Sequence, residues 1–243
     1  WKAWSDSFCY VVEPIEIAPF TTKRRILSVI ARLFDPLGWL GPVVIIAKTL
    51  MQDLWEEKCD WDDGVPPFIL IKWNAFLQNL PFISNIKIPR WVDFSPQYRV
   101  QIHGFCDASE KAYCGSIYIR TESPEGQINS HLLVAKTKVA PIKRTTIPKL
   151  ELCGALLIAK LIRSLVSNYQ FTYDLFLWTD SSIVLGWLQR PPNTLKTFVA
   201  NRVTEIISIA STNHWKHVRT EENTADLGTR GCSPQELAGN ILW

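Results

Sequence analysis

The first part of the chain carries apolar side chains mostly at helical spacing. Residues 23–34 place one apolar stripe on a predicted helix, and the turn at residues 35–38 ends it. Two more helices are predicted over residues 42–58 and 68–80, the second closed by Pro81. Residues 81–96 contain three prolines and predict an irregular linker. We therefore expect a smaller, mainly helical domain over residues 1–95.

From residue 98 the pattern changes to the two-residue period of β-strands. Strands are predicted over residues 99–106, 113–120 and 128–138, and the short turns between them indicate an antiparallel meander. A long helix (148–167) follows, then a buried strand (174–179), helices from 182 and over 195–210, a strand (214–219) and a last helix from about residue 224. Because a strand reached through a helix pairs in parallel, residues 96–243 predict an α/β domain with a mixed five-stranded sheet flanked by helices.

Composition excludes two broad classes. The 243 residues are 47% hydrophobic and 20% charged, which is typical of a globular chain and not of a disordered one. No run of about eighteen apolar residues lacks a charge or a breaker, so no membrane span is expected. The net charge is only +3, but residues 99–243 carry 16 basic and 12 acidic side chains. The six cysteines form no Cys-x-x-Cys pair and predict free intracellular thiols, and the initial Trp1 suggests a segment of a longer polypeptide.

Four carboxylates stand where predicted strands end or helices begin. Asp107 closes the first strand of the sheet, and Asp180 directly follows the buried strand. Glu151 lies in the first turn of an apolar helix, and Asp226 opens the last helix. Each acid alone has an ordinary explanation as a turn residue, a cap, a first-turn acid or a group at a solvent opening. For Glu151 the helix dipole offsets only about 0.3–1 kcal/mol of a burial cost of several kcal/mol.

The four acids together favour a metal site. At one edge of a sheet they repel one another unless a counter-charge lies between them. Carboxylate oxygens without a soft ligand nearby suit Mg²⁺ or Mn²⁺. Two such ions about 3.5–4 Å apart are the usual means of cutting a phosphodiester, since one activates the attacking water and the other stabilises the leaving 3′ oxygen.

Local phrases around these acids resemble a known family. The strings FCDAS, IPKLEL, LWTDSSIVLGWL and HWKHVRTEENTADLGTRG are similar to the RNase H region of a Pao/BEL-type LTR retrotransposon polyprotein. The strings RRILSVIARLFDPLGWLGP and LWEEKCDW resemble the segment that joins the reverse-transcriptase palm to RNase H. The resemblance covers nearly the whole chain. It implies a ribonuclease H-like fold for residues 96–243 and a thumb- or connection-like role for residues 1–95.

The resemblance also implies an activity and partners. The activity is hydrolysis of the RNA strand of an RNA–DNA hybrid during reverse transcription, beside an upstream polymerase domain of the same polyprotein. By motif match, Asp107, Glu151 and Asp180 are the main ligands of two Mg²⁺ or Mn²⁺ ions, and Asp226 completes the second site. The expected location is cytoplasmic, in virus-like particles. The chain departs from many cellular relatives because residues 219–224 contain no histidine. His214 and His217 precede that loop and, three apart on a strand, do not predict a metal site.

A basic run just before Glu151 is the candidate for phosphate contacts. Residues 126–150 contain no acid. Such a run is usually a solvated face, but beside a catalytic helix it favours tracking of a nucleic-acid backbone. Thr145 adds a hydroxyl there, and Ser109 and Ser181 are candidates to contact 2′-hydroxyls. The basic residues of this predicted surface are Lys136, Lys138, Lys143, Arg144 and Lys149.

Two other functions compete with the nuclease. This part of Pao-type polyproteins has also been named a peptidase, which makes an aspartic peptidase one alternative. The active site of an aspartic peptidase needs an Asp-Thr/Ser-Gly loop from each half of the enzyme. The nearest string here is Asp180-Ser181-Ser182, which lacks the glycine. The second alternative is a non-catalytic RNase H-like connection domain that binds nucleic acid. The presence of all four acids disfavours it.

Overall fold

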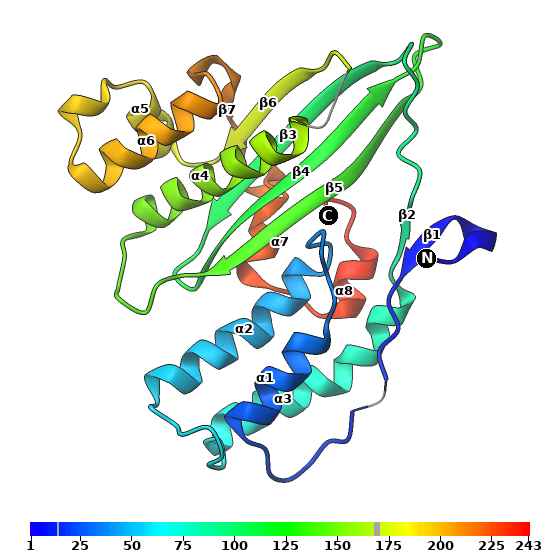
Figure 1. Cartoon of the computed structure of the whole chain (residues 1–243), viewed down its shortest axis with the longest axis vertical. Helices are drawn as coiled ribbons and strands as arrows, with labels where there is room; N and C mark the ends of the chain where they lie inside the picture. Colours follow the sequence, from blue (N-terminus) through cyan, green and yellow to red (C-terminus); the bar gives the residue numbers. More distant parts are fainter. Residues whose placement is uncertain (14, 168–170) are drawn as a thin grey trace.

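A mixed five-stranded sheet forms the centre of the second half of the chain. The computed structural model describes residues 1–243 except 14 and 168–170 (Figure 1). The strand order is β5-β4-β3-β6-β7, with β3, β4 and β5 antiparallel and with β6 and β7 added in parallel. This confirms the predicted sheet. Its strands are β3 (Arg99–Ala108), β4 (Ala112–Glu122), β5 (Ile128–Val139), β6 (Asp174–Thr179) and β7 (Trp215–His217).

Helices cover both faces of this sheet. On one face, α4 (Ile147–Val166) packs so closely that a Cβ added at Gly115 of β4 would meet Ile158 within 3.2 Å. On the other face, α7 (Ala225–Arg230) places Gly228 against the side chain of Cys114. Because successive strand residues point to opposite faces, these two contacts place α4 and α7 on opposite sides. Two further helices, α5 (Ser182–Leu188) and α6 (Thr197–Ile209), lie on the α4 side (Figure 1).

The first part of the chain is helical, as the periodicity predicts. It contains α1 (Lys23–Arg32), α2 (Gly41–Glu56) and α3 (Pro67–Asn79), which share a core of their own. That core also takes in Cys232 and Leu237 from the end of the chain. The segment before α2 is also hydrogen-bonded to the edge strand of the sheet, since Trp39 Nε1 donates to the Leu133 carbonyl of β5 at 3.2 Å. The helical region is thereby packed directly on the sheet domain.

Three predictions of elements need correction. The single last helix is two helices, α7 and α8 (Pro234–Gly239), because Gly231 between them has a φ of +78°. The last strand is shorter than predicted, since His214 lies in a 3-10 turn and β7 ends at His217. The predicted linker contains β2 (Lys87–Pro89), which pairs with β1 (Ser7–Cys9) in a small second sheet. Among the helices that the structure describes, none is both long and apolar enough to cross a membrane.

Candidate active site at the ends of β3 and β6

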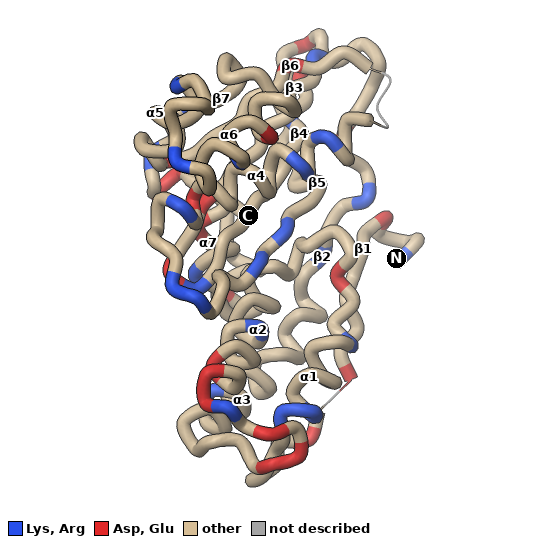
Figure 2. The backbone as a smooth tube through the Cα atoms, turned by 60° about the vertical axis from the view of Figure 1, so that its left-hand side comes forward, with Lys and Arg blue, Asp and Glu red and all other residues tan. Residues whose placement is uncertain are grey.

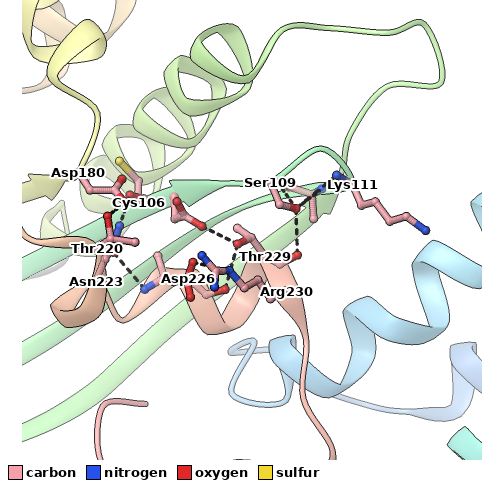
Figure 3. A network of polar contacts seen from close by, with 12 residues as sticks. Cys106, Ser109, Lys111, Asp180, Thr220, Asn223, Asp226, Thr229 and Arg230 are labelled. Carbon is pink, nitrogen blue, oxygen red and sulfur yellow. Dashed lines mark hydrogen bonds and ion pairs between the residues drawn. The ribbon is translucent and has the colours of Figure 1, made fainter.

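Strand pairing brings Asp107 and Asp180 together. Strands β3 and β6 are parallel, with Cys106 paired to Thr179, so each aspartate is the next residue beyond the last pair. Neighbouring strands lie about 4.8 Å apart, and both side chains leave the same face of the sheet. Asp107 is buried. Figure 3 shows Asp180 beside Cys106 at this edge.

Asp226 lies on α7, which packs against the same edge of the sheet. Asn223, just before the helix, donates from Nδ2 to the carbonyl of Cys106 at 3.1 Å. At the other end of α7, the Thr229 hydroxyl donates to Asp107 Oδ2, and the Ser109 hydroxyl donates to the Thr229 carbonyl at 3.1 Å (Figure 3). These bonds attach both ends of a six-residue helix to β3 and to the turn after it. Asp226 itself forms an ion pair with Arg230, one helical turn on, at 2.8 Å.

Glu151 reaches the edge from the opposite face, on α4. Gly154 lets this helix approach β3, since a Cβ there would lie 3.0 Å from the carbonyl oxygen of Asp107. Ser181, the residue after Asp180, donates from its hydroxyl to Glu151 Oε2 at 2.6 Å. The same hydroxyl caps α5 by accepting from the Val184 amide at 3.2 Å. Glu151 is therefore oriented by the residue that follows Asp180.

The pKa values of these acids show that they interact. Burial, and then the charges of Asp180 and Asp226, raise the pKa of Asp107 to about 6 although Thr229 opposes the shift. Burial, and then Asp180, raise the pKa of Glu151. The pKa of Asp226 is raised by burial and by Asp180, against the pull of Arg230. The acids thus lie close enough to repel one another, as the metal hypothesis requires.

The donor set fits hard divalent cations, although each acid is held by a protein group. Asp180 accepts from the Thr220 hydroxyl at 3.0 Å through Oδ2, while its Oδ1 is buried and has no hydrogen-bond partner among the described residues. Oxygen donors of this kind suit Mg²⁺ or Mn²⁺. Within the described part of the chain, no three His, Cys, Asp or Glu side chains already surround a point that could hold a metal ion. Binding a cation at this edge therefore requires carboxylates to turn away from their present donors.

The predicted nucleic-acid residues fall into two groups. The basic side chains are mostly exposed, and Figure 2 shows Lys and Arg along β5 and in the loop after it. Lys149 is half-buried, with Nζ 5.3 Å above the Phe198 ring. The Thr145 hydroxyl donates to the Lys143 carbonyl at 3.1 Å. The exposed basic residues are Lys136, Lys138, Lys143 and Arg144.

Ser109 and Ser181 bind neighbouring groups of the site, and their contact with nucleic acid stays a prediction. Ser181 is 5% exposed, and its hydroxyl is shared between Glu151 and the cap of α5. The Ser109 hydroxyl accepts from the amide of Ala112 at 3.2 Å and donates toward Thr229. In this structure both hydroxyls therefore orient neighbouring groups in the protein.

Sequence reasoning missed Thr229, Thr220 and Asn223. Thr229 had a readable signal, because a residue three positions after Asp226 lies on the same face of a helix. Thr220 lies in the short 3-10 turn Thr220–Glu222, in the loop where many cellular relatives carry a histidine. His217 is exposed at the end of β7, and the ring of His214 faces the Leu175 carbonyl at 3.1 Å. Neither histidine is bonded to one of the four acids.

Comparisons with known proteins agree with this architecture. The family model described as the Pao retrotransposon-like RNaseH-like domain matches residues 22–181, more than half of the chain. The match includes Asp107, Glu151 and Asp180 and ends before α7. No curated protein matches the chain.

Several solved structures resemble parts of the chain. RNase H1 from Halobacterium salinarum is 14% identical and has a TM-score of 0.32, over 52% of this chain and 90% of its own. The RNase H domain of Mycobacterium tuberculosis rv2228c, solved as a maltose-binding-protein fusion, is 13% identical with a TM-score of 0.33, over 60% and 94%. LC11-RNase H1, isolated from compost, is 14% identical with a TM-score of 0.34, over 60% and 99%. The assignment rests on the family match and on the observed sheet. The chain belongs to the family of Pao retrotransposon-like RNaseH-like domains.

Proposed function

We propose that the chain is a metal-dependent endonuclease that hydrolyses the RNA strand of RNA–DNA hybrids during reverse transcription of a retrotransposon. The observation that carries this proposal is the meeting of Asp107 and Asp180 on adjacent parallel strands, with Asp226 close enough to raise the pKa of Asp107. Asp107, Glu151 and Asp180 are the proposed main ligands of two Mg²⁺ or Mn²⁺ ions, and Asp226 completes the second site.

The protein side chains prepare this edge for cations and phosphates. When bound, two divalent ions supply an activated water and stabilise the leaving 3′ oxygen. Thr229 orients Asp107, and Ser181 orients Glu151, through the hydroxyl bonds described above. Because burial and mutual repulsion raise the pKa values of three of the acids, their ionised forms are high in free energy until a cation arrives. A bound cation lowers this repulsion between the carboxylates, and that gain favours metal binding.

The proposed partners follow from the family. The substrate is an RNA–DNA hybrid, tracked by the basic residues of β5 and the following loop. The upstream reverse-transcriptase domain of the same polyprotein is the proposed neighbour of residues 1–95, and the proposed location is cytoplasmic, in virus-like particles. A peptidase is not favoured, since Asp180 is followed by Ser181, which caps α5, where a peptidase loop needs Asp-Thr/Ser-Gly.

Cleavage of an end-labelled RNA–DNA hybrid tests the proposal. We expect RNA cleavage in Mg²⁺, none in EDTA, and none by Asp180→Asn, which should still bind the hybrid. The matched control is Asp174→Asn at the opposite, exposed end of β6. Cleavage that survives EDTA or Asp180→Asn would reject the assignment. Pepstatin-sensitive cleavage of a peptide would favour the peptidase instead.

A further inference from the structure

A large pocket lies between the helical region and the proposed catalytic edge. Its volume is about 650 Å³, and α2, α3, the turn between β3 and β4, and the segment after α7 form its walls. We call it the α2–α7 pocket. Ser109 and Thr229 belong to its wall, and Thr229 also contacts Asp107. Figure 3 shows Lys111 extending from the turn after β3 toward the helical region. The pocket therefore lies next to two of the four acids, Asp107 and Asp226.

The pocket combines an apolar floor with a charged rim. Buried or half-buried side chains of α2, α3 and the start of α8 make the floor, among them Leu50, Phe76 and Pro234. Lys72, Lys111 and Arg230 stand on the rim, together with the acids Asp53 and Glu110. An apolar floor with a few polar groups converging on it is the usual construction of a ligand site, and the volume suits one small ligand.

The two cations nearest the acids are exposed to solvent, and each is paired with an acid. The side chains of Lys111 and Arg230 are 63% and 66% exposed. Among the described residues, Lys111 pairs with Asp53 at 3.7 Å, and such exposed pairs contribute little stability. Arg230 lines the pocket and also binds Asp226, so it joins the pocket to the catalytic edge. A chain of phosphates that reaches the acids can continue past these two side chains into the pocket.

We propose that the α2–α7 pocket binds one unpaired nucleotide of the nucleic-acid strand that is held at the catalytic edge. The base lies against the apolar side chains that line the pocket, and its phosphates lie at Lys111 and Arg230. Unstacked bases are commonly held on aromatic and apolar side chains in this way. A base-paired duplex does not fit a pocket of this size. The inference rests on the proposed function and refines its substrate to hybrids with a single-stranded extension.

The test compares binding of two labelled hybrids, one blunt and one with a five-nucleotide single-stranded extension, by fluorescence anisotropy in EDTA. We expect the full chain to bind the extended hybrid at least about fivefold more tightly. Ala75→Trp, at an exposed position that lines the pocket, fills the space and should abolish the preference. The matched control Gln78→Trp lies exposed on the same helix outside the lining and should keep it.

A second variant keeps the result decisive if Ala75→Trp misfolds. Lys111→Glu, on the exposed rim, should also reduce the preference for the extended hybrid. Equal affinity of the unaltered chain for both hybrids overturns the proposal, and so does a preference that survives both variants. A pocket that binds AMP while the hybrids remain indistinguishable serves a free nucleotide and equally overturns it. Failure of the proposed function would appear separately, as absence of Mg²⁺-dependent cleavage of the blunt hybrid.

Discussion

The carboxylate edge and the basic surface of β5 carry opposite charges and are built in opposite ways. The four acids come from different elements, are partly or fully buried, and each is bound to a hydroxyl or guanidinium group of the protein. Lys136, Lys138, Lys143 and Arg144 are exposed, and within the described residues none of them forms an ion pair with an acid. The acids are thus held by bonds within the protein that must partly rearrange when a cation binds, while the exposed basic side chains can adjust to a ligand directly.

This difference assigns the chemical step to the carboxylate edge and the attraction of nucleic acid to the basic surface. Buried carboxylates that raise one another's pKa values store repulsion that a divalent cation can relieve. Exposed lysines repel one another little. Their contribution to binding comes from counterion release, and salt weakens it. We therefore expect substitutions at the edge to change the chemical step and substitutions on β5 to change affinity. The following predictions test that separation, beginning with the largest effect.

Asp107→Asn should abolish cleavage while the protein keeps its fold. A ligand to catalytic metal ions contributes several kcal/mol to transition-state stabilisation, so we expect a fall in kcat of about a thousandfold or more. Hybrid binding, measured by anisotropy, should change much less. Asp93→Asn, at a half-buried aspartate that contacts His131 of β5, is the control and should leave kcat unchanged. Near-normal cleavage by Asp107→Asn would remove this residue from the site.

Thr229→Val should weaken catalysis by an intermediate amount. The valine keeps the shape of the side chain but loses the hydroxyl that holds Asp107. Groups that orient metal ligands typically contribute 10–100-fold in affinity or activity. We expect the Mg²⁺ concentration for half-maximal rate to rise within about that range, and Thr229→Ser to restore it. An unchanged Mg²⁺ dependence in the valine variant would show that Thr229 has no positioning role.

The stability of the metal-free protein should reveal how much free energy the ionised, buried Asp107 carboxylate costs. Its pKa is about 6 in the folded chain and 3.8 in the reference state, so the folded protein holds this proton more tightly. Stability from this group is therefore lost as the pH rises from about 4 through 6, by an amount on the order of 1–3 kcal/mol. In EDTA, Asp107→Asn should melt a few degrees higher than the unaltered chain at pH 7, and the gap should close near pH 4. A variant that is less stable at pH 7 would contradict the proposed repulsion.

Substitutions on β5 should have the smallest effect. Lys136→Ala and Lys138→Ala should each weaken hybrid binding a few-fold in low salt and reduce the slope of log K against log salt by about 1. The value of kcat should stay the same. Lys58→Ala, at an exposed position just after α2 of the helical region, serves as the control. A large loss of kcat in either β5 variant would show that the two regions are not separate.

The sequence allowed much of this arrangement to be predicted, for identifiable reasons. Asp107 and Asp180 could be placed because Asp107 closes one predicted strand and Asp180 directly follows another, and strand order then brings them together. The split of the last helix could not be predicted, since it depends on the left-handed conformation of Gly231, and a glycine can also continue a helix. The second sheet was missed because each of its strands has three residues and about 80 residues separate them.

Side-chain roles were harder to predict than positions. The bond from the Ser181 hydroxyl to Glu151, which lies 30 residues earlier, could not be predicted, and contact of Ser181 with nucleic acid stays a prediction. Likewise, the packing of Leu237 into the core of the helical region follows from the return of the chain end to α2 and α3. Such directions are set by tertiary packing, and local periodicity carries no information about them.

Diffraction from crystals soaked in Mn²⁺ tests the central claim most directly. The account predicts anomalous peaks for bound Mn²⁺ among Asp107, Glu151, Asp180 and Asp226, with Asp107 and Asp180 contacting the same ion and the Thr220 or Arg230 bonds released. Mn²⁺ bound elsewhere, or no bound Mn²⁺ at this edge at concentrations that support cleavage, would contradict it.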